Sequence, residues 1–132
     1  MKEIRELLKG EKCLRDTEYI ECVKDLLKDP KCQQMIEYIQ GNIDLVISYC
    51  KEHMPQIKPL RPQASFLVWL DCRNLGLSHD ELTDLFVHKA GLALNDGDMF
   101  SPGGNGFMRL NVGTSRSTLE KAMNQLFDIL TR

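Results

Sequence analysis

The six residues from Phe66 to Asp71, Phe-Leu-Val-Trp-Leu-Asp, limit the fold of this chain more than any other segment. The run is too short and too uniformly apolar for a helix that faces water, so it predicts a central strand buried on both faces. A second strand is predicted over 107–112, where Phe-Met-Arg-Leu-Asn-Val alternates between two faces. The second half of the chain therefore has to build a sheet.

The first half of the chain has helical periodicity. Residues 17–28 and 31–53 each carry apolar side chains at the spacing of one helix face. Asp29–Pro30 supplies a cap and a first-turn proline between the two helices. Gly41–Asn42 lies inside the second helix and leaves open a break into two pieces. The stretch 56–58, flanked by prolines, is a candidate edge strand.

Turn and capping signals organise the rest of the second half. Ser78–Glu81 is a capping box that starts a helix over 79–90, and Gly91 ends that helix. The remaining segments read in order as a strand at 92–94, a turn at 95–98, a loop at 101–106 and, after the 107–112 strand, a last helix opened by a capping box at 117–120. The expected fold is α+β, with a small mixed sheet of three to four strands, helices packed on it, and a helical N-terminal segment before it.

Charge and hydropathy exclude several classes of partner. The formal net charge is −2, and no basic patch with interleaved aromatic residues occurs, so we expect no nucleic-acid partner. No apolar run approaches the roughly 18 residues of a membrane span. The charged N-terminus lacks the apolar stretch and cleavage site of a signal peptide, so we expect a cytoplasmic protein.

The cysteines and histidines are too scattered to predict a metal site or a disulfide framework. No cysteine pair has the spacing of a zinc knuckle or a redox dithiol. We expect buried or half-buried free thiols and structural or exposed histidines, with no metal; the residues are Cys13, Cys22, Cys32, Cys50 and Cys72, and His53, His79 and His88.

Arg109 is the most informative single residue. On the predicted 107–112 strand it shares a face with Phe107 and Asn111, while the apolar residues between them face the core. A guanidinium at this position needs a partner, because an unpaired buried charge is costly. Two interpretations stay open. In the first, the arginine lies at the open face of the sheet or pairs with an acid such as Asp71. In the second, it presents a rigid fork to a substrate carboxylate.

The other motifs carry less chemistry. The Gly103–Gly106 loop does not precede a helix, and it lacks the lysine and the hydroxyl residue of a phosphate-binding loop. Ser48–Lys51 has the S-x-x-K spacing of some acyl enzymes, but it lies on an amphipathic helix without the other parts of such a site. Asp71 and Asp96–Asp98 do not form a credible acid/base pair, since the second group is typical of a turn. No catalytic residue is assigned.

Three blocks resemble a known family: 61–73, 90–97 and 106–112. They are similar to the C-terminal domain of fold-type I pyridoxal-phosphate (PLP) enzymes. Within the class I and II aminotransferase superfamily, the nearest branch is the cystathionine β-lyase-like C–S lyases. The resemblance runs from about Gln33 to Leu130, so residues 33–132 are expected to form this small domain. Residues 1–32 are then a helical leader of uncertain origin.

The resemblance implies a role for Arg109 in binding the α-carboxylate of an amino-acid substrate, cystathionine-like in this branch. It also implies PLP as the cofactor of the parent enzyme. Arg116 matches a family position as well and is expected to be structural. The cofactor lysine, the partner of the pyridine nitrogen and the phosphate ligands of this family belong to a large domain, which the sequence does not contain. The chain alone is therefore not expected to bind PLP covalently or to catalyse.

Two further interpretations remain open. The chain is expected either to meet a large domain or to form a homo-oligomer. In the alternative, it is a non-catalytic assembly or binding module that retains the fold, with a dimer formed through residues 1–54.

Overall fold

The computed structural model describes residues 16–132. The expectations for residues 1–15, Cys13 among them, lie outside this part. The chain divides into two compact units, 1–36 and 37–132, and α3 runs through the boundary. The two helices expected in the first half are confirmed as α2 (Asp16–Leu27) and α3 (Pro30–His53).

The second unit contains a four-stranded antiparallel sheet in the order β1-β2-β4-β3. The strands are β1 (Lys58–Leu60), β2 (Leu67–Asp71), β3 (Asn95–Asp96) and β4 (Phe107–Asn111). The α+β fold is confirmed, but the sheet is not mixed. The helical crossover after β2 brings β3 into the sheet running in the same direction, and β4 then returns between them. Every neighbouring pair is therefore antiparallel.

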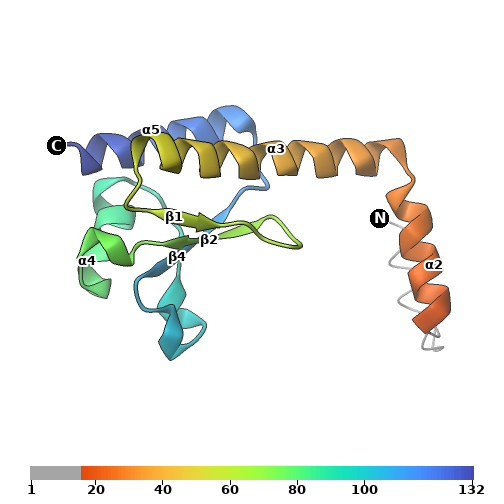
Figure 1. The fold of residues 1–132 in the computed structure, drawn as a ribbon, viewed down its shortest axis with the longest axis horizontal. Helices are drawn as coiled ribbons and strands as arrows, with labels where there is room; N and C mark the ends of the chain where they lie inside the picture. Colours follow the sequence, from red (N-terminus) through yellow and green to blue (C-terminus); the bar gives the residue numbers. More distant parts are fainter. Residues whose placement is uncertain (1–15) are drawn as a thin grey trace. The chain divides into compact units, whose positions relative to one another are not determined.

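Two long helices cover one face of this sheet. Figure 1 shows the C-terminal half of α3 and α5 (Arg116–Leu130) lying side by side over it, and Tyr49 Oη bonds to Asn124 Oδ1 between them at 2.6 Å. The core beneath includes Val46, Val68, Leu70, Phe86, Met108, Leu119 and Met123. We call the opposite side of the sheet the open face.

The strand over 66–71 is central as expected, but only one of its faces is fully buried. Val68 and Leu70 are inaccessible under the helices, whereas Leu67 and Trp69 are half-buried and Phe66 is exposed. The expectation of burial on both faces was wrong because no helix of residues 16–132 packs over the Trp69 side of this strand.

The edge strands β1 and β3 begin at Lys58 and Asn95, each later in the chain than expected. Ile57 donates its N–H to the Met54 carbonyl in a turn after α3, so the edge strand starts at Lys58 rather than Gln56. The segment 92–94 is not a strand, because Leu94 donates its N–H to the nearby Leu92 carbonyl.

The helix caps form at the expected residues, except at the N-terminus of the last helix. The Ser78–Glu81 capping box is present at α4 (His79–Asp84), which continues as a π-helical turn over Leu85–Lys89. Gly91 follows with a φ of +67°, in the left-handed region that favours glycine. The last helix is capped by Ser115, whose Oγ accepts the Thr118 N–H at 3.3 Å, and not by Ser117.

Gly41–Asn42 is a contact point and not a break in α3. A Cβ on Gly41 would lie 2.5 Å from Arg116 Nη2, so the glycine makes room for that guanidinium. Asn42 is fully buried; its Nδ2 donates to the carbonyls of Val112 and Thr114, each at 2.9 Å, and its Oδ1 accepts from Arg116 Nε at 3.1 Å. The structural role expected for Arg116 is confirmed.

Candidate functional site

A row of four side chains crosses the open face. Leu60 pairs with Trp69, Trp69 with Arg109, and Arg109 with Asn95, one residue from each strand. Directly opposed residues of an antiparallel sheet point to the same side, so these four share the open face. This confirms the predicted orientation of Arg109, because its neighbours Met108 and Leu110 are buried on the helix side.

Arg109 is held by neutral groups. Its Nη2 donates to Asn95 Oδ1 at 3.1 Å, and its guanidinium carbon lies 4.2 Å from the centre of the Phe100 ring. Its Nε is buried and has no hydrogen-bond partner within residues 16–132. No carboxylate of the described residues pairs with it. The guanidinium is thus oriented by an amide and a ring while its charge stays uncompensated, which suits an incoming anion.

Asp71 pairs with Arg73 and not with Arg109. Arg73 donates from Nε to Asp71 Oδ1 at 2.9 Å and from Nη2 to Oδ2 at 2.8 Å, in a two-pronged pair. The same guanidinium lies 4.9 Å from the centre of the Phe107 ring. The hydrogen bonds from Arg73 hold the pKa of the Asp71 carboxyl below its usual range. The pairing of Arg109 with Asp71, which the first interpretation allowed, was wrong, whereas the place of Arg109 at the open face of the sheet is confirmed.

Replacing Arg73 by glutamine is expected to raise the pKa of Asp71 toward its ordinary value, because the charged partner is lost. Since the folded-state pKa of Asp71 is lowered, this pair stabilises the fold above the unfolded pKa of about 3.9 and stops doing so as the pH falls through the folded value. Carboxyl-carbon NMR titration of the wild type and of Arg73→Gln checks this. An unchanged Asp71 titration in the variant would contradict it.

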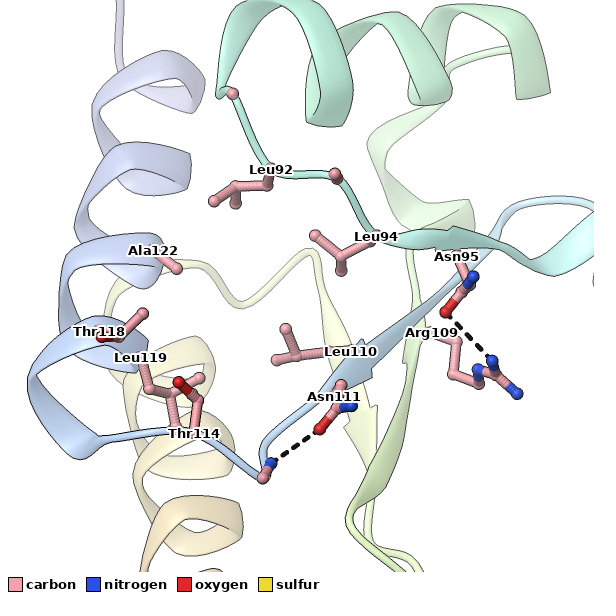
Figure 2. Close-up of a pocket in the computed structure, with 13 residues that line it drawn as sticks. Leu92, Leu94, Asn95, Arg109, Leu110, Asn111, Thr114, Thr118, Leu119 and Ala122 are labelled. Atoms are coloured by element: carbon pink, nitrogen blue, oxygen red, sulfur yellow. Dashed lines mark hydrogen bonds between the residues drawn. The ribbon is translucent and has the colours of Figure 1, made fainter.

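A cavity of about 390 Å³ lies between β4 and the first turns of α5, and its lining includes Arg109 and Asn95. Figure 2 shows Leu92, Leu94 and Leu110 gathered toward α5, whereas the Arg109 side chain points away from them and toward Asn95. A smaller hollow of about 250 Å³ lies on the open face, lined by Leu60, Trp69, Ser101, Gly103, Gly104 and Phe107. Arg109 thus lines the 390 Å³ cavity, and the smaller hollow lies on the same open face of the sheet without contacting Arg109.

Neither of these two cavities is lined by a lysine. A covalent PLP site needs a lysine amine together with groups that hold the phosphate and the pyridine nitrogen. The residues around Arg109 do not supply that set, so we derive no step through the cofactor. What this face can do chemically is bind and orient a carboxylate.

The cysteines of the described residues are free thiols, and two of them are deeply buried. Burial raises the pKa of Cys50 and of Cys72 to about 12 each, so both thiols stay protonated at neutral pH. Cys22 and Cys32 are half-buried and free, as expected. Across residues 16–132, no group of histidines, cysteines and acids could hold a metal ion, and no helix is long and apolar enough to span a bilayer.

Sequence reasoning missed three residues that shape the Arg109 site. Asn95 and Phe100 contact the guanidinium, and His79 bonds to Asp96 and Gly106, which flank the loop that carries Phe100. The turn composition of 95–98 gave no signal that Asn95 was in a strand opposite Arg109. His79 was placed correctly in the first turn of a helix, but its partners are 17 and 27 residues away.

No family model matches the chain. It is 36% identical over 85 residues to cystathionine β-lyase PatB of Bacillus subtilis, covering 64% of this chain and 22% of that protein. A PLP-bound protein from Clostridium difficile 630 superposes with a TM-score of 0.72 at 39% identity, over 74% of this chain and 25% of that one. Cystalysin from Treponema denticola, which contains pyridoxal 5′-phosphate, gives a TM-score of 0.73 at 28% identity, over 86% and 27%. The chain thus spans about a quarter of the proteins that it matches.

Proposed function

Because this chain corresponds in sequence and fold to the C-terminal part of class I/II PLP-dependent enzymes of the C–S lyase branch, we propose that it supplies the arginine that binds the α-carboxylate of an amino-acid substrate. The residue is Arg109. The substrate class we propose is cystathionine-like, since PatB and several other relatives are named cystathionine β-lyases.

The observation that carries this proposal is the uncompensated charge of Arg109. Among the other arginines of the second unit, Arg61 and Arg73 each pair with an aspartate, Arg116 bonds within the fold to Asn42, and Arg132 is exposed after the end of α5. Arg109 instead lies on the open face with its ring and amide neighbours, half-buried and without an acid among the described residues. A carboxylate would complete its hydrogen bonds in the two-pronged geometry that guanidinium groups favour.

The finer parts of the proposal follow from the same correspondence. The PLP-enzyme domain would begin near residue 33, and residues 1–32 would form a separate leader. PLP would be held by the part of the enzyme that lies outside this correspondence, so that the chain alone would be inactive. A cytoplasmic location and a homo-oligomer, or a complex with a large domain, complete the proposal.

A graft tests it. Residues 33–132 replace the matching quarter of PatB, and the release of thiol from L-cystathionine is measured with PLP present. We expect the graft to cleave cystathionine and the chain alone to show no cleavage. A folded graft that retains PLP but has no activity would contradict the proposal. So would a chain that alone forms a stoichiometric, lysine-bound PLP absorbing in the visible range.

A further inference from the structure

His79 uses both of its ring nitrogens. Its Nδ1 accepts the backbone N–H of Gly106 at 3.1 Å, and its Nε2 contacts Asp96 Oδ1. A backbone N–H can only donate, so Nδ1 carries no proton, and the neutral ring donates from Nε2 to the Asp96 carboxylate. The His79 side chain is 11% exposed. This imidazole is therefore a fixed bridge between the Asp96 side chain and the Gly106 backbone.

Asp96 and Gly106 flank one loop, which we define as residues 97–105. Asp96 precedes the loop and Gly106 follows it, and Asp96 Oδ1 also accepts the Asp98 N–H at 2.8 Å. The backbone at Gly97 and the backbone at Gly104 approach each other closely, since a Cβ on Gly104 would lie 2.0 Å from the Gly97 carbonyl oxygen. His79 lies in the first turn of α4, which the Ser78–Glu81 capping box stabilises. Both ends of the loop are thus attached to a capped helix terminus.

The 97–105 loop carries Phe100 to the Arg109 site. The Phe100 ring contacts the Arg109 guanidinium and also lies edge-on to Trp69, with the ring centres 5.6 Å apart. Phe100 is 46% exposed and its neighbour Met99 is 73% exposed, so little packing beyond these two contacts fixes the ring. Its position over the guanidinium depends on how the loop ends are held.

We propose that His79 is a positioning residue for the Arg109 site: it fastens both ends of the 97–105 loop and so keeps Phe100 over the guanidinium. This inference rests on the proposed function of Arg109. With the ring in place, the guanidinium plane is fixed and its remaining N–H groups point in constant directions. Without His79 the loop end at Gly106 is released, and the arginine samples other orientations before it meets a carboxylate.

Three substitutions of His79 in the full chain test its bonds to Gly106 and to Asp96 separately. His79→Asn retains an acceptor near the Nδ1 position, His79→Gln retains a donor near the Nε2 position, and His79→Leu retains neither. Trp69 is the one tryptophan, so near-UV circular dichroism and acrylamide quenching report directly on its contact with Phe100. We expect His79→Leu to match Phe100→Ala in both signals, and the two amide variants to lie between them and wild type.

His88→Gln is the matched control, since His88 is exposed in the adjoining π-helical turn and should leave the Trp69 signals unchanged. Far-UV circular dichroism shows that each variant retains its helices. Wild-type Trp69 signals in all three His79 variants would overturn the proposal.

Carboxylate binding gives the second readout. L-Methionine, a soluble thioether amino acid, is titrated into each full-length variant and followed by the single indole N–H signal in NMR spectra. We expect His79→Leu to weaken binding about 5-fold, as the loss of one exposed cation–π contact would. Phe100→Ala should cause a similar loss, and the double variant should add little to either.

The outcomes distinguish this inference from the proposed function. If Arg109→Gln weakens methionine binding but His79→Leu does not, His79 has no positioning role and the function of Arg109 stands. If Arg109→Gln binds methionine as wild type does, the proposed function fails and the role of His79 fails with it.

Discussion

Replacing Arg109 by glutamine in the grafted enzyme is expected to lower kcat/KM for L-cystathionine by about 100-fold. The variant loses two charge-assisted hydrogen bonds to the carboxylate, and together these are worth about 3 kcal/mol. A loss of about 1.4 kcal/mol is one factor of ten. Because the carboxylate does not change during C–S cleavage, its binding is the same in ground and transition states, so most of the loss should fall on KM. Steady-state kinetics measures the two constants separately.

Two further variants sharpen this result. Arg109→Lys keeps the charge but not the planar fork. Its kcat/KM should lie between those of wild type and Arg109→Gln, about 10-fold below wild type. Arg61→Gln is the control, because Arg61 is exposed, pairs with Asp44 and lies outside the Arg109 row. A loss of kcat at constant KM in Arg109→Gln would contradict a role in carboxylate binding.

Replacing Asn42 by leucine is expected to destabilise the fold by about 4 kcal/mol. The side chain is fully buried, and its amide bonds to the carbonyls of Val112 and Thr114. Leucine has a similar volume but no polar atoms, so both carbonyls would lose that donor at a cost of about 1–3 kcal/mol each, and Arg116 would lose an acceptor. Urea unfolding followed by far-UV circular dichroism measures the change in the free energy of unfolding.

Asn74→Leu is the matched control, since Asn74 is exposed in a short 3-10 turn and its substitution should change stability by less than about 0.5 kcal/mol. Asn42→Ser keeps one short polar group and should fall between leucine and wild type, which preserves the test if the leucine variant does not fold. Equal stability of Asn42→Leu and wild type would show that these bonds contribute nothing.

Local sequence determined the elements whose signals lie within a few residues. The alternation at 107–112 predicted which side of the sheet Arg109 occupies, and the Ser78–Glu81 box predicted the start of a helix; both are confirmed. The errors came from competing local partners. Ser115 took the cap expected at Ser117, and the Leu92–Leu94 contact replaced the strand expected at 92–94.

The partners of Arg109 were beyond the reach of sequence patterns. Asp71 was a reasonable acid for it, but Arg73 is two residues from Asp71 and reaches both carboxylate oxygens. Phe100 and Asn95 meet the guanidinium only because the β3–β4 pairing and the 97–105 loop bring them there. His79 showed no functional signal, since a lone histidine in a helix has no pattern that names its partners.

The sequence by itself therefore determined that Arg109 lies on one face of a strand with the core behind it, because side-chain alternation is a property of the strand alone. Only the tertiary structure decided that this arginine lacks an acidic partner among the described residues and is held by an amide and an aromatic ring. The reason is physical: compensation of a charge depends on groups brought together in space, and those groups are 9 and 14 residues away along the chain.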